Sequence, residues 1–175
     1  HHIVRRWMNV MSGLSTSSLL QDALSHIAAD VDHEFDTLLP LPGDARDRLY
    51  AAMRHATIGG GKRLRPLLVT ATAALFNVDR KTALRVGTAV EAIHVYSLVH
   101  DDLPCMDDDD LRRGKPTVHR AFDEATAVLA GDSLHALAFE ILANPNTHSD
   151  PFVRGELVST LALASGPEGM AGGQM

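Results

Sequence analysis

The chain has 175 residues, of which 45% are hydrophobic and 22% are charged, the composition of an ordinary globular domain with one substantial core. Its net charge of −6 argues against a nucleic-acid partner, because such partners are bound by basic surfaces. The single cysteine, Cys105, excludes an internal disulfide framework and indicates a reducing, cytoplasmic compartment. The apolar runs are interrupted before the roughly 18 to 20 residues that a membrane span requires, so no transmembrane helix is expected.

Residues 1–13 begin with two histidines and show no helical or strand period, so we interpret them as an added or unstructured leader. Beyond them, apolar residues recur at helical intervals, with capping residues before several of the runs and Pro or Gly after most of them. The predicted helices cover residues 15–39, 44–57, 67–76, 80–103, 123–142 and 151–164. No run of residues alternates between apolar and polar side chains, as a half-buried strand would. Apolar helices without strands predict an all-α bundle, in which sites lie between facing helices.

The glycines at 59–61 come directly before Lys62 and Arg65, at the start of a predicted helix. Free backbone N–H groups and the helix dipole can hold phosphate at such a place, together with the basic side chains. The segment is not a Walker loop, because Arg63 stands where Ser or Thr is needed and no strand precedes it. Taken alone, it could equally be an ordinary surface turn.

The central predicted helix is capped by Asp79 and is apolar on nearly every side. His94 is one of its few polar residues. Asp101 follows seven residues later, which places both side chains on almost the same face, about 10 Å apart. A lone histidine on a buried helix is more often a core residue, but sharing a face with an aspartate favours a functional role.

Six aspartates fall between Asp101 and Asp110, and Arg112 and Arg113 follow them. Carboxylates delivered by a buried helix indicate Mg²⁺, held by one or two aspartates with water and phosphate completing the coordination. A solvated acidic tail is the alternative, but tails do not follow buried helices. A calcium loop counted from Asp107 would need glycine where Arg112 stands. Because Pro104 ends the helix, we expect Asp107 to return toward Asp101 through a loop.

Four ordered motifs resemble the trans-isoprenyl diphosphate synthases of the bacterial farnesyl diphosphate synthase type. They are GGGKRLRP (59–66), EAIHVYSLVHDDLPCMDDDDLRRGKPTVH (91–119), AVLAGDSL (127–134) and GPEGMAGGQ (166–174). The resemblance implies the all-α isoprenoid synthase helical bundle and a prenyltransferase that joins isopentenyl diphosphate to an allylic diphosphate. It also implies a homodimer. Family chains are roughly twice this length, so residues 14–175 are expected to form the amino-terminal part of one domain, inactive on its own.

The resemblance further implies a role for each matching residue. Asp101 and Asp107 would bind Mg²⁺, supported by Asp102. Arg112 would contact the allylic diphosphate, and the isopentenyl diphosphate would be held by Lys62, Arg65, His94 and Arg113.

The expected product is farnesyl diphosphate, with geranylgeranyl diphosphate as the alternative. The resemblance assigns the chain-length stop to Tyr96, five residues before Asp101. Helical geometry is less favourable, since it turns Tyr96 away from the Asp101 direction and leaves a core aromatic as the other interpretation. A terpene cyclase would not need a second anion site, and a non-catalytic partner subunit would be expected to lose these aspartates or arginines.

Overall fold

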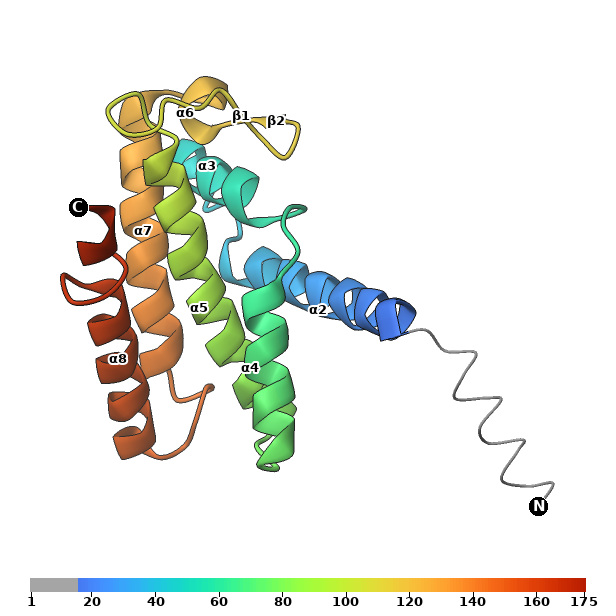
Figure 1. The fold of residues 1–175 in the computed structure, drawn as a ribbon. Coiled ribbons are helices and arrows are strands. Elements are labelled where there is room, and N and C mark those ends of the chain that lie inside the picture. Colours follow the sequence, from blue (N-terminus) through green and yellow to red (C-terminus); the bar gives the residue numbers. More distant parts are fainter. Residues whose placement is uncertain (1–15) are drawn as a thin grey trace, which may run out of the picture.

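The computed structural model describes residues 16–175, so the leader predicted at residues 1–13 lies outside the described part. The described chain is a helical bundle, as predicted (Figure 1). Its helices are α2 (Thr16–Leu38), α3 (Asp47–Thr57), α4 (Leu64–Leu75), α5 (Arg80–Asp101), α6 (Val118–Ala121), α7 (Glu124–Ala143), α8 (Pro151–Ser165) and the 3-10 helix η1 (Gly172–Gln174). Each of the six predicted helices is present, with its ends shifted by no more than three residues. The short elements α6 and η1 were not predicted.

Side-chain caps explain where three of these helices begin. Asp79 accepts a hydrogen bond from the Thr82 amide at the start of α5, and Asp123 accepts one from the Thr126 amide at the start of α7. Asp150 caps α8, and Pro151 follows it in the first turn, where proline costs no hydrogen bond. The caps fix the axial register of the three helices.

The structure corrects the expectation that the chain has no strands. Residues Leu111–Arg112 (β1) and Lys115–Pro116 (β2) pair as a small antiparallel hairpin. Arg113 and Gly114, which connect them, have φ of 53° and 76°, as a two-residue hairpin turn with two left-handed positions requires. Strands of two residues are too short to show alternation, so the sequence pattern could not reveal them.

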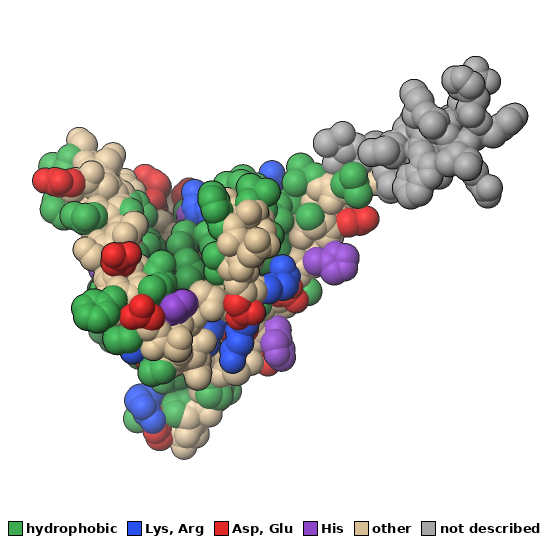
Figure 2. Space-filling view, turned by 90° about the horizontal axis from the view of Figure 1, so that it is seen from below, with side chains coloured by type: hydrophobic (Ala, Val, Ile, Leu, Met, Phe, Trp, Pro, Cys, Tyr) green, Lys and Arg blue, Asp and Glu red, His purple; other side chains and the backbone are tan. Residues whose placement is uncertain are grey.

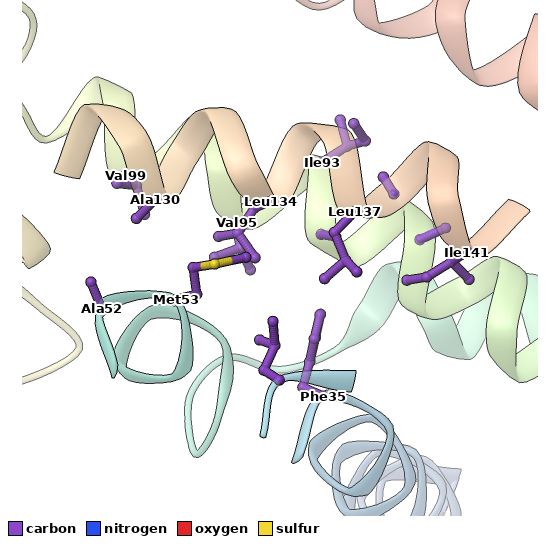
Figure 3. Close-up of a cluster of buried hydrophobic side chains, with 14 of the residues drawn as sticks. Phe35, Ala52, Met53, Ile93, Val95, Val99, Ala130, Leu134, Leu137 and Ile141 are labelled. Carbon is purple, nitrogen blue, oxygen red and sulfur yellow. The ribbon is translucent and has the colours of Figure 1, made fainter. Parts of the chain in front are cut away.

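The hydrophobic core lies where α5 and α7 run side by side, with α2 and α3 packed against them (Figures 1 and 3). In Figure 3, Phe35 and Met53 point toward the pair of long helices. The fully buried side chains include Ile27, Val31, Phe35, Leu134, Ile141 and Leu142. Burial of each such side chain contributes about 1.5 to 3 kcal/mol. The core therefore holds α5, which ends in the aspartates, at a fixed place.

Only the second half of α2 belongs to this core. Ile27, Val31 and Phe35 are buried, but Leu20, which continues the same helical period, is 50% exposed. Figure 1 shows the reason, because the first turns of α2 extend beyond the other helices. A helical period predicts which residues share a face, but it cannot tell how far along the helix a partner is present.

Among the described residues, α7 is long and apolar enough to cross a membrane by length and composition alone, which the sequence analysis did not foresee. In this structure α7 packs against α3, α5, α6 and α8, and 44% of its most apolar window is buried. A core helix of a bundle can have the composition of a membrane span, because it too packs against apolar groups.

Several exposed hydrophobic side chains lie at the end of the bundle opposite the aspartates. Figure 2, which views this end from below, shows hydrophobic side chains spread between charged groups. The connection between α4 and α5 exposes Leu75, Phe76 and Val78, and α8 begins with the exposed Phe152.

Gly131 lets α5 and α7 approach closely near the aspartates. A Cβ at this position would lie 2.1 Å from Nε2 of His100, whose ring nitrogen is 3.0 Å from the Val128 carbonyl oxygen. We expect Gly131→Ala to displace the imidazole and to lower the free energy of unfolding by about 1 to 3 kcal/mol. Urea denaturation of the chain measures this difference.

Gly155 on α8 is the matched control, because no atom lies within 4 Å of the Cβ that alanine would add there. Gly155→Ala should raise the free energy of unfolding by about 0.5 to 1 kcal/mol through the higher helix propensity of alanine. If Gly131→Ala is as stable as the unaltered chain, the close approach does not constrain the packing of the two helices.

Candidate active site

The aspartate-rich segment folds back over the end of α5. The helix ends at Asp101, and Pro104 lies in the turn that follows it. The Asp107 amide donates to the Asp101 carbonyl oxygen at 2.8 Å, and the Asp109 amide donates to the Asp102 carbonyl oxygen at 3.1 Å. Asp107 therefore returns to Asp101 through a loop, as predicted, and not through helical register.

The Asp101 side chain is half-buried and faces the end of the described chain. Its two carboxylate oxygens lie 3.1 and 3.3 Å from Nε2 of Gln174. Gln174 belongs to the GPEGMAGGQ motif, but the sequence offered no means of pairing it with Asp101, 73 residues away. The Asp107 side chain is exposed.

Asp102 forms an ion pair with Arg112. Its carboxylate accepts two hydrogen bonds from the guanidinium, at 2.9 and 2.7 Å, and its side chain is only 4% exposed. This hydrogen-bonded pair raises the pKa of Arg112 above its usual value. A bidentate contact fixes the plane of the guanidinium. In this structure Asp102 thus orients Arg112, where the resemblance had suggested support for the metal-binding pair.

The carboxylates at this end of α5 fit a magnesium site in which the protein supplies only part of the coordination. Among residues 16–175 there is no group of three or more His, Cys, Asp or Glu side chains that could hold a metal ion by itself. Mg²⁺ is usually bound through one or two carboxylates, with water and substrate phosphates as the other ligands. Asp101 and Asp107, joined through their backbones, supply that kind of donor set.

A basic surface lies beside the aspartates. It surrounds residues 59–63, and this segment is called the glycine turn below. Gly59 and Gly61 have φ of 78° and 84°, which glycine adopts without strain. A Cβ on Gly61 would lie 2.5 Å from Nη1 of Arg113, and one on Gly59 would lie 3.5 Å from Nζ of Lys115. The glycines therefore leave room for two cations from the hairpin against the turn.

His94 lies inside this basic surface, on the side of α5 that faces the turn. Burial is the main cause that lowers its pKa to about 4, and the next causes are the charges of Arg65, Arg113, Arg112 and Arg63. The imidazole is therefore uncharged at neutral pH. The charges of Arg65 and Arg113 thus act on His94, while the Lys62 and Arg65 side chains are themselves exposed near the start of α4.

A pocket opens between α3, the glycine turn, the last turns of α5 and the hairpin. It is lined by His55, Ala56, Ile58, Gly59, Gly60, Val95, Leu98, Val99, Asp102, Arg112, Arg113, Lys115, Pro116, Thr117 and Val118. Its polar wall contains both arginines of the LRR segment. An anion in this pocket would meet several positive charges, and an apolar group could extend toward Val95 and Leu98.

Sequence reasoning did not select several polar residues that the structure places here. His55 and Lys115 line the pocket, and Arg63 and Glu91 are buried beside it. Lys115 could have been noticed from the Gly-Lys-Pro sequence after the two arginines. Buried Arg63 and Glu91 carry no such signal, because a charged residue in a helix pattern is expected to face solvent.

Tyr96 lies on a different side of α5, toward α7. Its ring stacks on His135 with centroids 4.7 Å apart and planes at 17°, and it meets the edge of His100 at 5.5 Å. Burial raises the pKa of Tyr96 above its usual value, followed by the charges of Asp101 and Asp132. The phenol is therefore half-buried and close enough to Asp101 to be affected by its charge.

Known proteins resemble this chain in sequence and in fold. The family model described as "Polyprenyl synthetase" matches residues 46–167, which is more than half of the chain. The chain belongs to the polyprenyl synthetase family. It is 54% identical over 141 residues to the farnesyl diphosphate synthase of Escherichia coli and 52% identical over 136 residues to that of Bacillus subtilis. The crystal structure of an FPP/GFPP synthase from Zymomonas mobilis matches with a TM-score of 0.87 at 66% identity.

This member of the polyprenyl synthetase family spans about half the length of the relatives it matches. The two matches include 78% and 75% of this chain but 46% and 45% of the E. coli and B. subtilis proteins. The structural match covers 89% of this chain and 56% of the Z. mobilis chain. The similarity to this synthase structure agrees with the all-α isoprenoid synthase fold of the described helices.

Proposed function

We propose that this chain forms the amino-terminal part of a prenyltransferase that condenses isopentenyl diphosphate with an allylic diphosphate, dimethylallyl or geranyl, to give farnesyl diphosphate. The proposal rests on one observation: the site is divided into an acidic part and a basic part. Carboxylates stand at the end of α5, and an arginine-rich surface around His94 stands beside them. The relatives named farnesyl diphosphate synthases favour this product over geranylgeranyl diphosphate.

The allylic diphosphate is assigned to the aspartate end of the site. Its allylic carbon–oxygen bond breaks only if the charge on the departing diphosphate is stabilised. Mg²⁺ bound by Asp101 and Asp107 would neutralise part of that charge. Arg112, oriented by Asp102, presents a fixed guanidinium to the same group.

Isopentenyl diphosphate is assigned to the basic surface formed by Lys62, Arg65, His94 and Arg113. Uncharged His94 can donate a hydrogen bond to a diphosphate oxygen, and the arginines supply the charge. The double bond of isopentenyl diphosphate attacks the allylic carbon, a new carbon–carbon bond forms, and a proton leaves to the released diphosphate. Holding the two substrates in line supplies the entropic part of the catalysis.

Further assignments, on domain, activity of the chain alone, assembly and location, complete the proposal. Residues 14–175 would form part of a single isoprenoid synthase domain, and the chain by itself would be inactive. A homodimer is supported by the family resemblance, and a cytoplasmic location by the single free cysteine, Cys105. The arginine-rich surface supports a two-substrate synthase over a terpene cyclase, and the retained aspartates support an enzyme over a non-catalytic partner subunit.

Lys62→Ala and Arg65→Ala are expected to raise KM for isopentenyl diphosphate by about tenfold or more, with a much smaller change in KM for the allylic substrate. Each substitution removes a charge-assisted contact of about 1.5 to 3 kcal/mol from the metal-free anion site. Initial rates of farnesyl diphosphate formation by the complete enzyme, with each substrate varied in turn, measure both constants.

Lys81→Ala is the control, because Lys81 is an exposed lysine at the start of α5, at the other end of the bundle. It should leave both constants unchanged. Equal increases in the two KM values for Lys62→Ala and Arg65→Ala would contradict the division of the site between two diphosphates. Absence of a prenyl product from the complete enzyme would refute the function itself.

A further inference from the structure

The glycine turn has an unusual backbone that needs support from outside the turn. Gly59, Gly61 and Arg63 all have positive φ, and Arg63, at 56°, is not a glycine. A left-handed conformation costs a non-glycine residue about 1 to 2 kcal/mol. Such a conformation persists only where surrounding contacts hold it in place. Lys62 sits between two of these residues, so its position depends on those contacts.

The support comes from α2, through a single carboxylate oxygen of Asp32. This oxygen accepts a hydrogen bond from the Gly59 amide at 3.2 Å, at the first residue of the turn. It also accepts one from Nη2 of Arg63 at 3.0 Å, at the last residue. Asp32 therefore connects both ends of the turn to a helix whose neighbouring residues Val31 and Phe35 are fully buried.

Arg63 extends the connection into the interior. Its side chain is only 1% exposed, and its Nη2 also donates to the Thr57 carbonyl oxygen. Nη1 lies 3.6 Å from the buried Glu91 carboxylate on α5, and the guanidinium is 5.8 Å from the Phe35 ring centroid. A buried arginine with these contacts cannot reach a substrate at the surface. Arg63 therefore affects the site only through the backbone of the glycine turn.

We propose that Asp32 is a positioning residue for the isopentenyl diphosphate site, because it holds the glycine turn and through it the places of Lys62, Arg65 and Arg113. This inference rests on the proposed function and adds a residue of α2 that no resemblance assigns. Among the described residues, no hydrogen bond or ion pair joins Asp32 to the aspartates at the end of α5, so we expect it to act on isopentenyl diphosphate and not on the allylic diphosphate. Without it, the turn has to be ordered when the substrate binds, and that ordering weakens binding.

Asp32→Ala in the complete enzyme tests the proposal. KM for isopentenyl diphosphate should rise about tenfold, while kcat and KM for the allylic diphosphate stay within about twofold. The inhibition constant of inorganic pyrophosphate, competing against isopentenyl diphosphate, should rise in parallel. Asp32→Asn keeps an oxygen that can accept from Gly59 and should raise KM less, by about threefold. Asp32 is 34% exposed, so the folded bundle should tolerate both changes.

Asp30→Ala is the matched control. Asp30 lies on the same helix and also pairs with an arginine of α5, Arg80, but both side chains are exposed and the pair is not joined to the glycine turn. It should leave all constants unchanged. An unchanged KM for isopentenyl diphosphate in Asp32→Ala, or equal increases for both substrates, would overturn the positioning role.

Lys62→Ala, measured in parallel, separates this inference from the proposed function. If Lys62→Ala raises KM for isopentenyl diphosphate and Asp32→Ala does not, only the positioning role is wrong. If Lys62→Ala has no effect, the assignment of the site is wrong, and the role of Asp32 in it is wrong with it.

Discussion

Replacing Asp101 or Asp107 with alanine is expected to lower kcat of the complete enzyme by at least about 100-fold at saturating substrates, the cost of losing one group that stabilises charge in a transition state. Both aspartates belong to the segment that folds back on the end of α5, with the Asp107 amide bonded to the Asp101 carbonyl oxygen. Removal of Mg²⁺ with a chelator should abolish turnover of the unaltered enzyme, and added Mg²⁺ should restore it. Steady-state rates over a range of Mg²⁺ concentrations measure both effects.

Asp110 provides a control within the same aspartate run. Its side chain is 65% exposed and pairs with Arg120 at 3.0 Å, away from Asp101. Because exposed ion pairs of this kind contribute little, Asp110→Ala should keep kcat within about twofold of the unaltered enzyme. A near-normal kcat for Asp101→Ala or Asp107→Ala at saturating Mg²⁺ would show that the metal is bound elsewhere or is not required.

Tyr96→Ala is expected to change the product from fifteen carbons to longer chains. The ring lies half-buried between α5 and α7, stacked on His135, and the Asp101 charge is one of those that raise its pKa. A chain growing from a diphosphate at the aspartates and running back along α5 would meet the ring. Chromatography of the products made from dimethylallyl and isopentenyl diphosphates measures the distribution.

Tyr50 is the only other tyrosine in the chain and gives a matched control. It lies on α3, where Arg46 is 6.0 Å from its ring centroid. Tyr50→Ala should leave the product length unchanged. If Tyr96→Ala also gives an unchanged profile, Tyr96 is a core aromatic, the interpretation that helical geometry alone allowed.

The glycine turn shows what a local pattern can and cannot predict. Adjacent glycines before basic residues at a helix start indicate an anion site, because the reasons are local: backbone freedom, free amides and side-chain charge. Pairing that turn with Asp32 and with the Arg113 guanidinium requires segments that are distant in the sequence to meet. No local period carries that information.

The α5 segment shows the same limit for site residues. The run of aspartates and Pro104 were enough to predict a helix end and a returning loop, since proline ends a helix for steric reasons. The Asp102–Arg112 pair and the contact of Asp101 with Gln174 were not predictable. Each depends on how a loop closes over the helix, which is decided by packing.

The sequence by itself determined the all-α class and the positions of the six main helices, because helical period, caps and breakers act over a few residues. It indicated some of the charged residues of the candidate site but not Arg63, Glu91 or Lys115, which only the folded structure places there. The tertiary structure alone decided which of those charges meet: His94 among arginines, Asp102 with Arg112, and Asp32 with both ends of the glycine turn. The physical reason is that hydrogen bonds and ion pairs act over a few ångströms. They therefore depend on the distances that the packed core sets between α2, α5 and the hairpin.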